Sequence, residues 1–118
     1  MVHQDLLSVP FVKISIKDLI LDHERNFRRF KMVWIQGTVA KIIGDKEFTM
    51  SDCENLGHSV SITSNSTKPS AGQYIQVLGE VLEKAKIRAV KIVNIESSIL
   101  REMWPLELED FQRMNKAG

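Results

Sequence analysis

The fold is decided by residues 32–39, which read MVWIQGTV. Aliphatic side chains recur at every second position of this stretch apart from one glycine, and a β-strand places alternate side chains on opposite faces. We therefore expect a strand that turns Val33, Ile35 and Val39 toward a core. Gly37, inside the strand, indicates a bulge or a sharp bend, which the long first strand of a small barrel requires.

Four more segments follow with the same period of two, separated by turn-rich or polar stretches. The predicted strands are residues 47–51, 59–63, 73–82 and 87–95. Five strands, a bent first strand and a closing helix fit the five-stranded Greek-key barrel called the OB-fold better than a sandwich, which uses about seven strands. The predicted fold class is therefore all-β, with a short N-terminal helix and an amphipathic C-terminal helix.

Before the barrel, the sequence predicts a short strand at 11–14 and a helix near 16–23. Ser15 stands where a helix N-cap belongs. Ile16, Leu19 and Ile20 share one side of that helix, so we expect it to lie against the barrel. The chain then divides into three parts: an N-terminal strand, helix and basic connector at 1–31, the barrel at 32–96, and a docking helix at 97–118.

The C-terminal segment is amphipathic at helical spacing. Its apolar residues fall in one stripe: Met103, Trp104, Leu108, Phe111 and Met114. Proline is tolerated in the first turn of a helix, so Pro105 predicts a regular helix that begins close to Trp104. The stripe either folds back onto the chain's own barrel or docks onto a partner.

The outward positions of the predicted strands are also partly apolar. They are Trp34, Tyr74, Leu78, Leu82, Ala89 and Val93. Contiguous apolar patches above a few hundred Å² are uncommon on monomers, so this surface needs a cover. The chain's own helices or a partner protein can supply it.

Composition limits the class of protein. The chain has 118 residues, 43% of them hydrophobic, and a formal net charge of +1, which removes the simplest argument for autonomous nucleic-acid binding. Cys53 is the only cysteine, so no internal disulfide can form, and a reducing compartment, the cytosol or the nucleus, is expected. The sequence contains no apolar run of about 18 residues, so no membrane span is predicted.

A single-stranded nucleic-acid binding module is the rival interpretation. Its best basic patch is Arg25, Arg28, Arg29 and Lys31, which is also explained as a solvated linker. Such sites stack bases on aromatic side chains, and only Phe48 and Tyr74 are available on the second to fourth strands. Acidic residues beside Phe48 would repel phosphate.

An enzyme is the weakest of the three classes. Asp52, Cys53, Glu54 and His58 lie close in sequence, but their spacing matches no zinc pattern and no second ligand pair exists. Neither a metal nor any other cofactor is predicted, and no glycine-rich phosphate loop is found.

Several motifs together resemble one family. They are Val33-Trp34-Ile35-Gln36-Gly37, Gly72-Gln73-Tyr74, Val77-Leu78-Gly79-Glu80-Val81, Ala89-Val90-Lys91-Ile92, Met103-Trp104, Leu106-Glu107 and Glu109-Asp110. Spread over residues 32–113, they are similar to the small OB-fold subunit of the RecQ-mediated genome instability complex. The barrel pattern alone is also similar to the middle subunit of replication protein A.

The resemblance implies a nuclear, non-catalytic subunit that pairs with an OB barrel of the complex's larger subunit. Through it the chain would join a Bloom-type RecQ helicase and topoisomerase III, which dissolve double Holliday junctions. The interface residues implied are Met103, Trp104, Leu108, Phe111, Met114, Trp34, Leu78 and Lys91. Little or no direct DNA binding is expected of this subunit.

Overall fold

The computed structural model describes residues 11–25, 31–52, 58–65, 69–83 and 86–117, with side chains up to residue 113. The elements in chain order are β1 (Val12–Lys13), α1 (Ile16–Glu24), β2 (Met32–Ile42), β3 (Glu47–Ser51), β4 (Ser59–Thr63), β5 (Tyr74–Val81), β6 (Lys86–Asn94) and α2 (Ser98–Ala117). All five predicted barrel strands and both predicted helices are present. No helix in the described ranges is long and apolar enough to cross a bilayer.

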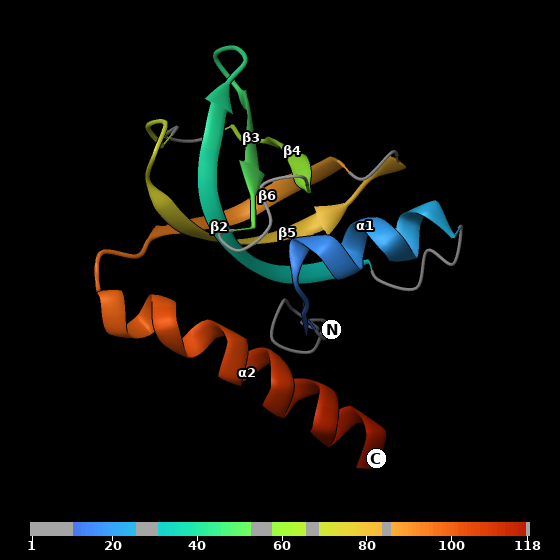
Figure 1. Cartoon of the computed structure of the whole chain (residues 1–118). Coiled ribbons are helices and arrows are strands. Elements are labelled where there is room, and N and C mark those ends of the chain that lie inside the picture. Colours follow the sequence, from blue (N-terminus) through green and yellow to red (C-terminus); the bar gives the residue numbers. More distant parts are fainter. Residues whose placement is uncertain (1–10, 26–30, 53–57, 66–68, 84–85, 118) are drawn as a thin grey trace, which may run out of the picture.

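Strands β2 to β6 form a closed barrel (Figure 1). Neighbours around it run in the order β2, β3, β4, β6, β5 and back to β2, and β1 adds a short parallel strand beside β2. Strands β4 and β6 pair in parallel, while the other barrel pairs are antiparallel. This arrangement is an OB fold, as predicted from the five strands.

Strand β2 is long and curved because it serves two neighbours (Figure 1). Its first part pairs with β5 and its second part with β3, and Thr38 pairs with both. Gly37 allows β3 to approach β2 closely, since a Cβ at this position would lie 2.4 Å from the backbone oxygen of Ser51. Of the two alternatives predicted for Gly37, a bulge or a sharp bend, the bulge is not found there: Gly37 stays in register with Ile75, and the register shifts between Val39 and Lys41.

The core consists of the inward positions of the strands, among them the predicted Val33, Ile35 and Val39. Val33, Ile35, Val39, Phe48, Met50, Val60, Ile62, Ile75, Val77 and Ile87 are all at most 2% exposed. Helix α1 adds to this cluster, with Ile16 0% and Leu19 1% exposed, and so packs against the barrel as expected. Ser15 caps α1, since its side chain accepts a hydrogen bond from the backbone N–H of Asp18 at 3.0 Å.

Strand β6 contains an irregularity that reverses one prediction. Gly79 pairs with Ala89, but Leu78 pairs with Lys91, so Val90 is an extra residue in β6. Ala89, predicted to face outward, is half-buried and packs against the core instead. The outward prediction for Ala89 was wrong because it assumed unbroken alternation up to Val93, whereas the extra residue shifts the phase.

Candidate partner-binding surface

Helix α2 begins six residues earlier than the position of Trp104 predicts. Its first residue is Ser98, and Ser97 caps it by accepting a hydrogen bond from the backbone N–H of Leu100 at 3.4 Å. Pro105 is therefore inside the helix, where it leaves the carbonyl of Arg101 without a helical donor. Pro105 and Arg101 both line an open groove beside the helix.

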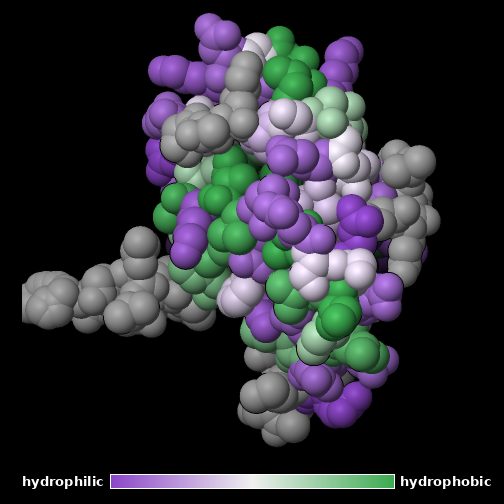
Figure 2. Space-filling model, turned by 90° about the vertical axis from the view of Figure 1, so that its left-hand side faces the viewer, coloured by the Kyte–Doolittle hydropathy of each residue, from purple (hydrophilic) through white to green (hydrophobic). Residues whose placement is uncertain are grey.

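The early start gives α2 two apolar faces instead of one. The inner face is Trp104, 6% exposed, with Leu108 and Phe111 half-buried. The other face, which we call the outer stripe, is Ile99, Met103 and Leu106, which are 68%, 44% and 60% exposed. These residues recur at intervals of four and three, so they share one side of the helix. Figure 2 shows hydrophobic residues gathered in the lower part of the molecule, where α2 lies.

The structure therefore separates the predicted interface residues of α2. Met103 belongs to the outer stripe, whereas Trp104, the next residue, points toward the chain's own barrel. The side chain of Met114 lies outside the described residues. The predicted single stripe missed Ile99 and Leu106; their spacing is visible in the sequence once Ser97 is recognised as the cap.

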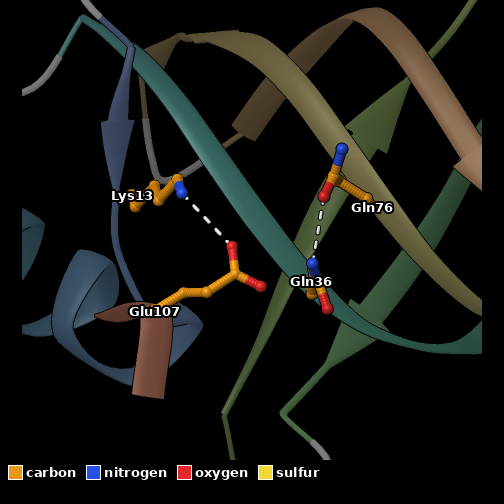
Figure 3. A network of polar contacts seen from close by, with 4 residues as sticks. All are labelled: Lys13, Gln36, Gln76 and Glu107. Carbon is orange, nitrogen blue, oxygen red and sulfur yellow. Dashed lines mark hydrogen bonds and ion pairs between the residues drawn. The ribbon is translucent and has the colours of Figure 1, made fainter. Parts of the chain in front are cut away.

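A cation–π contact and a chain of hydrogen bonds lie under the inner face. The guanidinium of Arg101 is 4.3 Å from the ring centroid of Tyr74. The Tyr74 hydroxyl donates to Oε1 of Gln36 at 3.0 Å, and Nε2 of Gln36 donates to Oε1 of Gln76 at 3.0 Å (Figure 3). Gln36 is only 4% exposed, and these two bonds engage its carbonyl oxygen and one of its two N–H donors. Gln36 and Tyr74 both face outward on the barrel, and they are buried because α2 covers them.

Lys13 holds the middle of α2 to the barrel. Its ammonium lies 3.2 Å from Oε1 of Glu107 (Figure 3). The same ammonium lies 4.5 Å from the ring centroid of Trp34. The indole N–H of Trp34 is buried and has no hydrogen-bond partner among the described residues. The aromatic ring, the ammonium and the carboxylate thus form a stack between β2, β1 and α2.

The outer face of the sheet beside α2 continues the apolar surface. Trp34 pairs with Leu78 in β5, and Leu78 pairs with Lys91 in β6, so the three form one row across the barrel. Trp34 and Leu78 are half-buried and Lys91 is exposed. The structure therefore brings these three predicted interface residues together.

A groove of about 620 Å³ separates α2 from α1 and the end of β3. Asp52 lies in it and accepts hydrogen bonds from the backbone N–H groups of Ile16 at 3.3 Å and Lys17 at 2.9 Å. Burial raises the pKa of the Asp52 carboxyl, and those two hydrogen bonds and the nearby His58 oppose the increase. Asp52 thus ties the start of α1 to the barrel.

The structure gives the rival nucleic-acid site little support. Phe48 is completely buried in the core, and Tyr74 is 5% exposed beneath Arg101, so neither ring is available to stack a base. Arg25 ends α1 and Lys31 precedes β2, both exposed, while Arg28 and Arg29 lie outside the described residues.

The acidic and histidine residues near β3 form no metal centre in the described part of the chain. Asp52 and His58 are described, but Cys53 and Glu54 are not. Among the described residues, no three His, Cys, Asp or Glu side chains are grouped so that they could hold a metal ion.

Comparison with known proteins places this geometry in context. No curated protein sequence matches the chain. The telomere capping protein Ten1 from Saccharomyces pombe is similar in structure, with a TM-score of 0.67 and 11% identity, over 88% of this chain and 99% of that one. A chain of the yeast Stn1 and Ten1 structure is also similar, with a TM-score of 0.69 and 14% identity, over 90% of this chain and 74% of that one.

A chain of a replication protein A heterotrimer bound to single-stranded DNA is also similar. The TM-score is 0.61 at 11% identity, over 72% of this chain and 74% of that one. Identities this low support the shared fold alone. At the level of sequence, a model of the family described as RecQ-mediated genome instability protein 2 matches residues 13–112.

Proposed function

This chain belongs to the RecQ-mediated genome instability protein 2 family, and from that membership we propose that it is a non-catalytic adaptor subunit of a nuclear dissolution complex. It pairs with the OB domain of the larger RecQ-mediated genome instability subunit. Through that subunit it is attached to topoisomerase III and a Bloom-type RecQ helicase, which dissolve double Holliday junctions.

The outer stripe of α2 carries this proposal. Ile99, Met103 and Leu106 are large, apolar and exposed on one side of a helix whose other side already rests on the barrel. Full burial of such a side chain contributes about 1.5–3 kcal/mol, and the three are already about half-buried, so covering them contributes roughly 3–5 kcal/mol before ordering costs. A surface of this kind is typical of a helix that is covered on both sides in an assembly.

The proposed interface extends from α2 to the strands. Leu100, 49% exposed, lies beside the outer stripe, and the row of Trp34, Leu78 and Lys91 adds half-buried apolar surface with a cation at its end. Met103 from the predicted interface remains in it. The inner face contributes to the interface indirectly, because Trp104, Leu108 and Phe111 hold α2 on the barrel so that the outer stripe faces outward.

Co-purification tests the pairing. We expect Leu106→Glu to abolish capture of the larger subunit's OB domain when the two are co-expressed, because a carboxylate would be buried without a partner. Ile43→Glu is the matched control, since Ile43 is 53% exposed but lies beyond the end of β2, away from α2. Both variants should keep the wild-type circular dichroism. Undiminished capture by Leu106→Glu would contradict the proposal.

A further inference from the structure

We propose that the groove between α1 and α2 binds a short acidic peptide segment of a partner protein, with one carboxylate on Arg101 and an apolar side chain against α2. None of the three outer-stripe residues, Ile99, Met103 and Leu106, is among the residues that line this groove. The inference therefore concerns a second surface and goes beyond the pairing proposed above.

Arg101 is fixed at the groove with most of its donors unused. Its guanidinium lies 4.3 Å from the ring centroid of Tyr74, and a cation–π contact holds a guanidinium in place while leaving most of its five N–H groups without an acceptor. Arg101 forms no hydrogen bond or ion pair through this side chain with any described residue. A guanidinium presents its N–H groups as a fork that matches a carboxylate. Arg101 is therefore positioned to bind one.

The same turn of α2 offers an unused acceptor. A helical carbonyl points toward the N–H four residues on, and for Arg101 that residue is Pro105, which has no N–H. Both residues line the groove, so this carbonyl lies at its wall. A peptide meets both needs, because its backbone N–H groups donate and an aspartate or glutamate side chain accepts. A phosphodiester backbone supplies acceptors only.

The charges around the groove favour a single carboxylate over a run of them. Lys17, on the α1 side, has no ion-pair partner in the described ranges. The Asp52 carboxylate is already engaged, since it accepts hydrogen bonds from the backbone N–H groups of Ile16 and Lys17. Glu102, on α2, also lacks a cationic partner within this part of the chain, and it would repel a second anionic group. Two unengaged cations against one unengaged carboxylate thus fit a peptide with one acidic side chain.

An apolar wall completes the groove. Trp104, Pro105 and Leu108 line it from α2, and Trp104 is 6% exposed while Leu108 is half-buried. The volume of about 620 Å³ lies within the range of roughly 300–1,000 Å³ that is usual for ligand pockets. An apolar side chain next to the acidic one would rest on this wall, so we expect the two residue types side by side in the bound segment.

Selection from a library of short random peptides tests the inference on the full chain. We expect the selected peptides to share an aspartate or glutamate beside a leucine, phenylalanine or other large apolar residue. A fluorescein-labelled copy of the consensus peptide then gives the affinity by anisotropy, which should weaken at high salt. A selection that enriches no acidic residue, or that yields no binder, would overturn the inference.

Variants of the groove locate the selected peptide. Arg101→Gln should weaken binding by at least about tenfold and Lys17→Gln by about threefold, because each removes a charged donor. Glu102→Gln should tighten binding about twofold, since it removes a like charge. Lys86→Gln is the control, because Lys86 is an exposed lysine at the start of β6 that does not line the groove. Circular dichroism checks the fold, and Lys17→Gln stays informative if Arg101→Gln loosens α2. Unchanged affinity in both of these variants would overturn the inference.

Two competitors separate the alternatives. If single-stranded oligo(dT) displaces the peptide and binds less tightly to Arg101→Gln, the groove holds nucleic acid and the inference is wrong. Leu106→Glu should leave the affinity for the peptide unchanged, because Leu106 does not line the groove. Loss of peptide binding in Leu106→Glu would place the peptide on the outer stripe and overturn the inference. Capture of the larger subunit's OB domain is a separate measurement, so the proposed function and this inference can fail independently.

Discussion

The ammonium of Lys13 lies 3.2 Å from Oε1 of Glu107, and within the described residues this is the one ion pair that joins α2 to another element. The two side chains are 25% and 29% exposed, so water screens the pair only in part. The pair is one of the contacts that set the rotation of α2 about its own axis, because Glu107 lies between the inner face and the outer stripe. The orientation of the proposed interface thus depends on a contact between residues 94 positions apart.

Loss of this ion pair should weaken the docking of α2 slightly. We expect Lys13→Met, which keeps an unbranched chain over Trp34, to lower the free energy of unfolding by about 0.2–1 kcal/mol. A double-mutant cycle with Glu107→Gln, measured by urea denaturation, isolates the coupling. A coupling energy of zero would show that the two groups do not interact in solution.

The two faces of α2 should respond differently to truncation. Trp104→Ala removes a buried aromatic ring, so we expect a loss of about 2–4 kcal/mol and faster hydrogen exchange in α2. Leu106→Ala, at an exposed position of the same helix, should stay within about 0.5 kcal/mol of wild type. Comparable losses in the two variants would mean that α2 is rotated relative to the orientation described.

The pH dependence of stability should report on Asp52. Burial raises the pKa of this carboxyl above 3.8 in the folded chain, so folding favours its neutral form over its charged form. The stability that this group contributes is fully present below 3.8 and is lost as the pH rises through the folded pKa. Asp52→Asn should flatten that decline in urea denaturation series. An identical slope in wild type and variant would show that Asp52 does not titrate abnormally.

Asp52 also anchors α1, which can be tested at neutral pH. Asp52→Ala leaves the backbone N–H groups of Ile16 and Lys17 without their acceptor, so we expect a loss of about 1–2 kcal/mol. Asp52→Asn keeps one acceptor oxygen and should lose less. If the alanine variant is as stable as wild type, solvent replaces the carboxylate fully.

Gly37 should tolerate no side chain. A Cβ at this position would lie 2.4 Å from the oxygen of Ser51 and 3.0 Å from Cδ1 of Ile16, so Gly37→Ala must separate β2 from β3. We expect a loss of at least about 2 kcal/mol in thermal or urea unfolding. Gly44→Ala is the control, since no atom lies within 4 Å of its Cβ position, and it should stay within about 0.5 kcal/mol.

Much of the barrel could be read from local patterns. Alternation over residues 32–39 predicts the inward set, and Val33, Ile35 and Val39 are buried as expected. Ser15 predicts the start of α1 because capping is a contact between residues three apart. Such features depend on neighbours in the chain, so the sequence by itself determined the elements, most of their faces and, through five strands in this order, the OB fold.

The tertiary structure decided what depends on distant contacts. The pairing of Leu78 with Lys91 turns Ala89 inward, and no local pattern marks Val90 as the extra residue. A helix with apolar residues on two sides does not reveal which side its own barrel will cover. Three contacts decide which side is covered: Arg101 lies over Tyr74, Trp104 packs on the barrel and Lys13 pairs with Glu107. These contacts exist only after the strands have closed into the barrel.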